Sequence, residues 1–380
     1  MTDRNPRRVI SVDDLRRYAL ARSFFQPTTL GRAVTKLGFV QADPIRAPAR
    51  AQDLILRHRV LGYKAGDLER AYSNLGLEED FFLNYGFLPR RSQALMHPRI
   101  PRREWPTARS RQAQAVLAYI TERGSVHPRD VERQFAYGKI TNWFGGSSNA
   151  ATHLLDEMHS RGLLRVVRRE GGTRVYAVRQ ATSEDAKSSL SADDRFDALV
   201  DIAVRQYAPV PSPGLGRFAS MVARAAPQWR LQRAAALARA KRRYARTRLD
   251  GIEWYWPANE SPGSSRWQTP DVVRLLTPFD PVVWDRRRFR LFWDWDYRFE
   301  AYTPAAKRKL GYYAMPLLWR DQVIGWGNLS VTQDALEATF GYCAGRAPKQ
   351  PGFRLALETE LDAVRRFLGL STSNQAKSGR

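Results

Sequence analysis

The amino-acid sequence predicts a mainly α protein with β structure (α+β), built of several helical units and one β-rich domain at its C-terminal end. Three observations support this prediction. Up to about Asp250, apolar residues recur at helical spacing in runs that often end at glycine. After Gly251 the runs become β-prone and are interrupted by proline and glycine. The length of 380 residues, with 43% hydrophobic residues, allows several domains to bury their own cores.

The middle of the chain, 106–181, shows its architecture most openly. Three amphipathic runs predict helices: 111–123, 128–135 and 147–161. Two β-rich runs, 163–169 and 173–178, follow and are joined across Glu170-Gly171-Gly172, which is a hairpin signal. Three helices and then a hairpin is the order of a winged helix, a relative of the helix-turn-helix.

Polar residues lie off the apolar stripe of the third predicted helix: Ser148, Asn149, Thr152, His153 and Arg161. Side chains in this position contact DNA in many winged helices. They would equally form a solvated face, and the pattern alone favours neither interpretation.

The segments on both sides of this unit have a similar plan. In 1–105 the predicted helices are 12–21, 29–37, 45–58 and 67–72, with Ser11 as a plausible N-cap for the first. In 182–250 a Ser-rich linker (182–191) precedes helices at 194–208, 216–225 and 229–248. The weak repetition predicts tandem winged-helix units at 1–105, 106–181 and 182–250.

The last part, 251–370, is expected to be a β-barrel-like domain. Its β-prone runs are 252–256, 272–276, 310–319, 323–331 and 335–342. A helix at 353–368 closes the domain, with Glu358, Glu360 and Asp362 expected on its outer side. The final segment, 371–380, reads as a disordered tail.

The chain is strongly basic, with a formal charge of +24 and a pI near 10.7. Its 53 Arg against nine Lys reflect a GC-rich genome, but exchanging Lys for Arg adds no net charge. Binding of a polyanion is the better explanation, and double-stranded DNA is the expected partner.

Other composition data limit the location and the chemistry. The single Cys343 excludes an internal disulfide and a cysteine metal cluster, and the five His are scattered, so no metal site is expected. No apolar run has transmembrane length, and the first residues lack a signal-peptide core. We expect a cytoplasmic, nucleoid-associated protein with no membrane contact.

The segment Gln41-Ala42-Asp43 places an amide and a carboxylate two residues apart, just after a predicted helix. Pro44 biases Asp43 away from helix, and in extended chain both side chains project to the same side. From spacing alone, an Asp capping the next helix beside a surface Gln is the simpler interpretation.

Two stretches nevertheless resemble a known family. One is Gln41-Ala42-Asp43 with Arg57-His58-Arg59; the other is Phe279-Asp280-Pro281 with Trp284-Asp285-Arg286-Arg287, continued by the Tyr302-Thr303-Pro304 and Gly311-Tyr312-Tyr313 segments. Together they resemble the winged-helix DNA glycosylases that unhook interstrand crosslinks, the AlkZ/YcaQ-like family. The resemblance covers most of the chain and favours a catalytic role for Gln41 and Asp43.

The resemblance implies a monofunctional DNA glycosylase that hydrolyses the N-glycosidic bond of alkylated purines, including crosslinked ones, without a cofactor. Asp43 is then expected to activate water and stabilise the cationic sugar, and Gln41 to orient the water. An N7-alkylated purine already carries a positive charge before the bond breaks, so it needs no general acid and one carboxylate suffices. Ala42 is smaller than the hydrophobic residue expected there.

Several basic residues are expected to contact DNA phosphates: Arg46, Arg50, Arg57, Arg59, Lys241, Arg242, Arg243, Arg286 and Arg287. Arg46, Arg50 and Arg57 are predicted to form a helical stripe, because they are four and seven residues apart. For any single residue of a charged run, a solvated face remains the alternative.

One segment departs from the family pattern. Relatives carry charged residues where this chain has Trp326-Gly327-Asn328, which puts the binding role of that strand in doubt.

A different class of protein also fits the sequence, namely a winged-helix transcription regulator without catalysis. A regulator would usually dimerise, whereas this chain shows no heptad helix and is expected to be a monomer.

Overall fold

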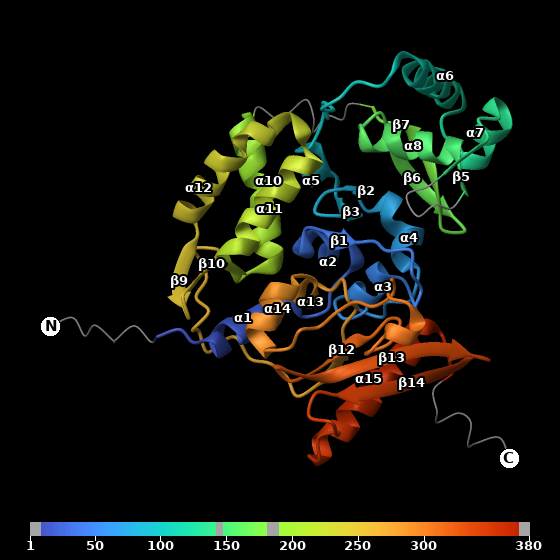
Figure 1. Cartoon of the computed structure of the whole chain (residues 1–380). Helices are drawn as coiled ribbons and strands as arrows, with labels where there is room; N and C mark the ends of the chain where they lie inside the picture. Colours follow the sequence, from blue (N-terminus) through green and yellow to red (C-terminus); the bar gives the residue numbers. More distant parts are fainter. Residues whose placement is uncertain (1–8, 142–146, 181–189, 372–380) are drawn as a thin grey trace.

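The computed structural model describes residues 9–141, 147–180 and 190–371 (Figure 1). The fold mixes α and β structure, and a curled four-stranded sheet lies at the C-terminal end, as the sequence predicted. Most of the predicted linker (182–191) and of the predicted tail (371–380) falls outside the described residues.

The N-terminal part combines helices with a small sheet that the sequence analysis missed. Its helices are α1 (Val12–Ser23), α2 (Leu30–Leu37), α3 (Ala51–Leu56), α4 (Asp67–Ala71), η1 (Tyr72–Asn74) and α5 (Arg90–Ala94). Its strands are β1 (Val40–Gln41), β2 (Leu77–Phe81) and β3 (Tyr85–Pro89), paired antiparallel in the order β1-β3-β2. Ser11 caps α1 as predicted, because its hydroxyl accepts from the Asp14 N–H at 3.1 Å.

The predicted helix at 45–58 is wrong over its first half. Residues 42–50 form a loop, and α3 begins only at Ala51. Pro44 and Pro48 lie in this loop, and proline removes the N–H that a helical turn would need. The expected helical stripe of Arg46, Arg50 and Arg57 therefore does not exist.

The middle part has the predicted order of three helices and a hairpin. It contains α6 (Thr107–Arg123), α7 (Pro128–Phe135), α8 (Ala150–Ser160), β6 (Leu164–Glu170) and β7 (Thr173–Val178), with two short strands, β4 (Lys139–Thr141) and β5 (Ser147–Asn149), before α8. Its own core includes Val116, Ile120, Leu154 and Met158, as the apolar spacing predicted.

Three consecutive carboxylates of β2 attach the middle part to the N-terminal part. Glu78, Glu79 and Asp80 are all at most 2% exposed. Each is paired with arginine, and the partners are Arg90 and Arg165 for Glu78, Arg169 and Arg174 for Glu79, and Arg99 for Asp80. Buried carboxylates are stable only when they are paired in this way, so the hairpin arginines Arg165 and Arg169 fix β6 against β2.

The third part contains α10 (Ala192–Tyr207), α11 (Ser212–Ala225), η2 (Pro227–Gln232) and α12 (Arg233–Arg243). Its strands β8 (Val210–Pro211), β9 (Ala245–Leu249) and β10 (Ile252–Trp256) form a sheet in the order β8-β10-β9. The predicted helix at 229–248 is therefore too long. It ends at Arg243, because the chain turns into β9 and pairs with the aromatic strand β10.

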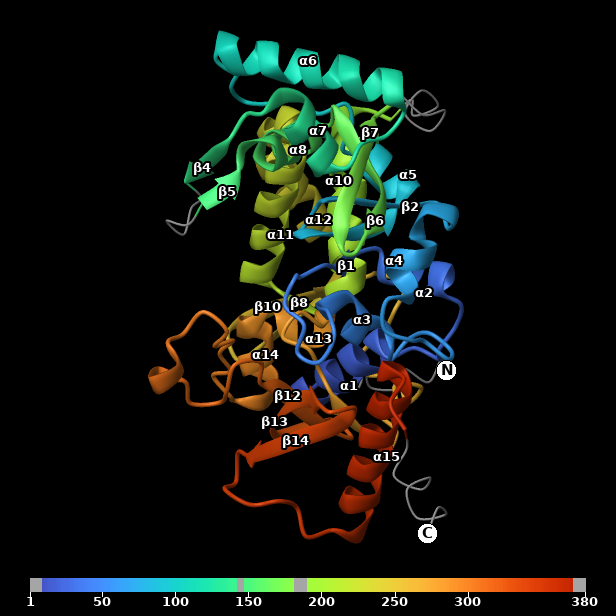
Figure 2. The same cartoon turned by 90° about the vertical axis from the view of Figure 1, so that its right-hand side faces the viewer.

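The C-terminal part contains the sheet β11-β12-β13-β14, formed by β11 (Val273–Leu275), β12 (Met315–Trp319), β13 (Gln322–Thr332) and β14 (Ala335–Tyr342). Its helices are α13 (Pro281–Trp284), α14 (Arg286–Trp293), η3 (Ala305–Lys307) and α15 (Pro351–Leu368). Helix α15 packs against the sheet, and both lie below the N-terminal helices at the end opposite α6 (Figure 2). One core joins them, since Val34 and Leu56 cluster with Leu317 and Phe367.

The outer side predicted for Glu360 is wrong. Glu360 is only 6% exposed, and it accepts a hydrogen bond from the Leu275 N–H at 2.7 Å. The carboxylate thus ties α15 to β11, while Glu358 stays exposed and pairs with Arg354.

Candidate active site

The segment that carries Gln41 and Asp43 is held by a short strand pairing. Gln41 pairs with Gly86 of β3, and the Ala42 N–H donates to the Tyr85 carbonyl at 2.9 Å. A Cβ at Gly86 would collide with the Val40 carbonyl and lie 2.8 Å from the Phe39 ring. Only glycine at position 86 therefore lets β1 approach β3 this closely.

We expect Gly86→Ala to destabilise the fold by about 1–3 kcal/mol and to displace Gln41, because the added methyl has no free volume. Urea denaturation and base-release assays would measure the two effects. The control is Gly216→Ala on α11, where a Cβ meets nothing within 4 Å. Equal stability of the two variants would contradict the inference that position 86 has no space for a Cβ.

Gln41 is buried, with 5% of its surface exposed. Its Oε1 has no hydrogen-bond partner among the residues that the structure describes. A buried acceptor without a partner is costly. The carbonyl of this amide is thus free to accept a hydrogen bond from a water molecule or a substrate group.

Asp43 follows as a half-buried carboxylate in the loop. Its Oδ1 accepts from the Ile45 N–H at 3.0 Å, and its own backbone N–H donates to Gln52 Oε1 at 3.4 Å. Burial raises the pKa of Asp43 above its ordinary 3.8, and the Ile45 hydrogen bond offsets part of that rise. Asp43 is therefore a fixed carboxylate with increased basicity.

Two tyrosines of the C-terminal part lie within electrostatic reach of Asp43. Burial raises the pKa of Tyr302, and the charge of Asp43 raises it further. The same two causes raise the pKa of Tyr313, whose hydroxyl lies 2.9 Å from Thr277 Oγ1. The loop residues Arg46 and Pro48 also line one pocket with Tyr312 and Tyr313, so the two stretches that resemble the family come together beside the Asp43 loop.

The sequence analysis did not single out Gln52 and Glu69, which support this loop. The Gln52 Nε2 donates to Glu69 Oε1 at 3.1 Å, and the same carboxylate pairs with Arg50. Gln52 is thus linked to the Asp43 backbone on one side and to Glu69 on the other. A Gln and a Glu 17 residues apart give no spacing signal, so only the folded chain reveals the link.

Asp53 is the other carboxylate near the loop, and it serves the core. Its Oδ1 accepts from the Tyr63 hydroxyl at 2.7 Å and from the Gly66 N–H at 3.0 Å. Asp53 is 4% exposed, so Asp43 is the better placed of the two to meet a substrate.

Comparisons with known proteins identify the family of this chain. The family model described as DNA glycosylase AlkZ-like matches residues 34–367. The chain belongs to the AlkZ-like DNA glycosylase family. Among solved structures, Streptomyces sahachiroi DNA glycosylase AlkZ is similar over 95% of this chain and 98% of its own, with a TM-score of 0.59 and 15% sequence identity. That likeness shows a shared fold, and the family match confirms the resemblance predicted from the sequence.

The structure of this AlkZ-like glycosylase corrects two of the predicted DNA contacts. Arg59 is fully buried and donates to both carboxylate oxygens of Asp280, at 2.8 and 3.1 Å. The Arg57 side chain is 4% exposed and donates to Glu360 and to the Leu275 carbonyl. Both guanidinium groups hold the N-terminal part against the C-terminal part, so neither is free to meet a phosphate.

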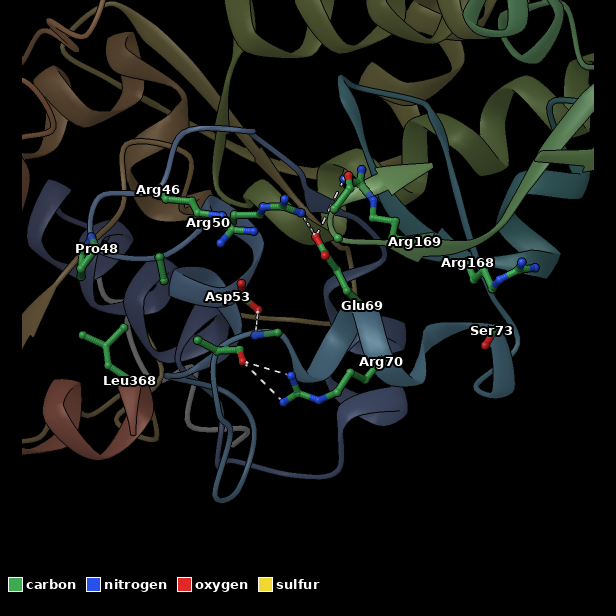
Figure 3. Close-up of a pocket in the computed structure, with 15 residues that line it drawn as sticks. Arg46, Pro48, Arg50, Asp53, Glu69, Arg70, Ser73, Arg168, Arg169 and Leu368 are labelled. Atoms are coloured by element: carbon green, nitrogen blue, oxygen red, sulfur yellow. Dashed lines mark hydrogen bonds and ion pairs between the residues drawn. The ribbon is translucent and has the colours of Figure 1, made fainter. Parts of the chain in front are cut away.

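The loop arginines differ from each other. Arg46 is exposed and has no hydrogen-bond or ion-pair partner among the described residues. Arg50 is half-buried and paired with Glu69 (Figure 3). Of the two, Arg46 is the one available to DNA.

The basic clusters on α12 and α14 each contain both exposed residues and residues held by other groups of the protein. Lys241 and Arg242 are exposed at the end of α12, whereas Arg243 pairs with Asp197 at 2.9 Å and Asp201 at 2.6 Å. In the cluster on α14, Arg287 is exposed. Its neighbour Arg286 donates to the Pro278 carbonyl at 2.9 Å, and its guanidinium lies 4.7 Å from the Tyr297 ring centre. Burial lowers the pKa of Arg286, and its contacts make it a structural residue rather than a surface cation.

Several polar residues of the third predicted helix are occupied locally. Asn149 caps α8 by accepting from Ala151 and Thr152, His153 lies 3.2 Å from Glu157, and Arg161 stacks on Trp105 at 4.1 Å. The side chain of Ser148 lies outside the described residues. A DNA contact by this helix stays a prediction.

Within 9–141, 147–180 and 190–371, no group of three or more His, Cys, Asp and Glu side chains is arranged to hold a metal ion. Across the same ranges, no helix is both long and apolar enough to cross a membrane.

Proposed function

We propose that this DNA glycosylase is monofunctional and hydrolyses the N-glycosidic bond of alkylated purines, including purines crosslinked between strands. The observation that carries the proposal is the half-buried Asp43, held by the Ile45 N–H beside the buried and unpaired Gln41 carbonyl oxygen. One carboxylate with one amide acceptor suits a reaction in which the leaving base is already cationic.

In the proposed mechanism the bond between the sugar C1′ and the purine breaks first. The positive charge of the sugar grows as the bond lengthens, and the Asp43 carboxylate stabilises it. Asp43 then accepts a proton from the attacking water, while the Gln41 Oε1 accepts a second hydrogen bond and orients that water. An N7-alkylated purine departs as a neutral molecule and needs no proton from the protein.

The surrounding architecture suits a duplex with a bulky lesion. We propose that the helices α6–α8 with the hairpin β6–β7 form a winged helix, and that the flanking helical parts are related units acting on DNA as a monomer. A lesion tied to both strands impedes extrusion of the base, so a reactive carboxylate on a loop is better suited to it than a deep pocket.

The proposal is tested with a duplex that carries a nitrogen-mustard crosslink. After incubation and treatment with alkali or an abasic-site lyase, denaturing gels should show separated strands with breaks at the former crosslink. Strands that stay joined, on this substrate and on N7-methylguanine duplexes, would overturn the proposal.

The pH dependence of base release follows from the raised pKa of Asp43. A general base works only when deprotonated, so the rate should fall as pH decreases through a midpoint above the ordinary 3.8. Single-turnover release of N7-methylguanine from about pH 4 to about pH 8, corrected for spontaneous depurination, would measure it. A midpoint at or below the ordinary value would contradict the burial of Asp43.

A further inference from the structure

A pocket of about 650 Å³ lies beside the loop formed by residues 42–50, between the N-terminal part and the turn of the β6–β7 hairpin (Figure 3). Its charged lining residues are five arginines and two carboxylates: Arg46, Arg50, Arg70, Arg168, Arg169, Asp53 and Glu69. The excess of arginine gives the pocket a net positive charge, which favours an anion over a cation.

The inner wall of the pocket is built from compensated charges. Glu69 pairs with Arg50 and lies 3.9 Å from Arg169, which also pairs with the buried Glu79. Arg169 donates to the Gly172 carbonyl at 3.0 Å, and a Cβ at Gly172 would collide with the Arg50 guanidinium. Glycine in the hairpin turn thus lets Arg50 lie directly against it, which fixes the turn of the middle part beside the loop of the N-terminal part.

Three arginines of this pocket are exposed, and one of them, Arg70, pairs with Asp67 and donates to the Ala65 carbonyl. The other two are more accessible to a ligand. Arg46 is exposed and has no partner among the described residues, and Arg168 keeps 51% of its side chain exposed. The pair that Arg168 forms with Glu170 is itself exposed, so it competes weakly with a ligand. In Figure 3 these two side chains lie on opposite sides of the Arg50–Glu69–Arg169 cluster.

The position of Arg46 connects the pocket with the reaction. Arg46 is three residues after Asp43, and it also lines a second pocket of about 710 Å³ that contains Tyr312 and Tyr313. An anion held by Arg46 would therefore lie near the Asp43 loop, between these two pockets.

We propose that this arginine pocket binds backbone phosphates of the strand next to the lesion, with Arg46 and Arg168 as the contacting cations. The inference rests on the proposed function, because it assumes a damaged duplex at Asp43. It assigns DNA contact to the hairpin turn of the middle part rather than to helix α8. The phosphate contacts position the sugar for Asp43 and carry no sequence preference.

The test uses duplexes in which one phosphate at a time is replaced by a neutral methylphosphonate, at successive positions around an N7-methylguanine. Dissociation constants are measured for Asp43→Asn, which slows turnover, alone and combined with Arg46→Ala or Arg168→Ala. The control variant is Arg354→Ala on α15, whose side chain is 88% exposed. Thermal melts check that each variant is folded.

With Arg46 intact, one or two replacements should weaken binding about tenfold. With Arg46→Ala or Arg168→Ala the same replacement should have no further effect. The slope of log affinity against log salt should become shallower by about 0.9 for each phosphate that the variant no longer neutralises. Arg354→Ala should leave both properties unchanged.

If the losses of affinity from phosphate replacement and from arginine substitution are additive at every position, the proposed phosphate contacts are wrong, whatever the base-release assay shows. Conversely, the two losses of affinity could be non-additive while the wild type releases no base. That result would support the phosphate contacts and reject the glycosylase mechanism. A third arm adds inorganic phosphate. Inorganic phosphate could raise the melting temperature of the wild type but not that of Arg46→Ala, while the duplex measurements show only additive losses. In that case the site binds a small anion and the DNA assignment is wrong.

Discussion

Asp43→Asn is expected to lower the rate of base release by about 10²–10⁴-fold while the duplex dissociation constant changes little. The substitution keeps the size of the side chain and can keep the Oδ1 contact with the Ile45 N–H, which is 3.0 Å in the native loop. It removes the negative charge that stabilises the cationic sugar and the basicity that accepts a proton from water. The measurement is single-turnover release of N7-methylguanine, with affinity determined separately.

Asp250→Asn is the matched control for this experiment. Asp250 is exposed in the turn between β9 and β10, with a φ of 48° that asparagine also adopts readily. Its activity should equal that of the wild type. Turnover by Asp43→Asn at the wild-type rate would remove Asp43 from the mechanism and leave Gln41 without a catalytic partner.

Asp280→Ala is expected to destabilise the protein by about 3–5 kcal/mol. Asp280 and Arg59 are both fully buried, and their two hydrogen bonds join the C-terminal part to the N-terminal part. Removing the carboxylate leaves a buried guanidinium charge without compensation and removes the cap of α13, because Asp280 Oδ1 accepts from the Val282 N–H at 3.0 Å. Urea denaturation followed by tryptophan fluorescence would measure the decrease in stability.

A partly exposed ion pair supplies the comparison. Asp362→Ala breaks the pair with Arg365 on α15, whose side chains are 42% and 22% exposed, and should cost less than about 1 kcal/mol. The double variant Arg59→Met with Asp280→Leu should be more stable than Asp280→Ala, because it leaves no unpaired charge. A destabilisation by Asp280→Ala no larger than that by Asp362→Ala would show that Arg59 finds another partner or water.

Local rules predicted much of the secondary structure. The N-cap at Ser11, the glycines after α2 and α6, and the Gly171-Gly172 turn act over a few residues, so the sequence reveals them directly. The strands β2 and β3 were not predicted, because the consecutive charges Glu78, Glu79 and Asp80 lack the apolar alternation of a strand. Their burial depends on arginines that are distant in the sequence.

The sequence by itself determined the family resemblance, the candidate pair Gln41 and Asp43, and the positive charge that suits DNA. It also determined the apolar stripes of the middle helices, because those depend on periodicity within one element. The burial of individual charges was decided only by the tertiary structure. Arg46, Arg57 and Arg59 look equivalent along the chain, yet Arg46 is exposed while Arg57 and Arg59 meet Glu360 and Asp280 in the core. The energy of a charged side chain depends on its ion-pair partners and on its exposure to water, and both are set by the folded chain. The spacing of residues along the sequence describes neither of them.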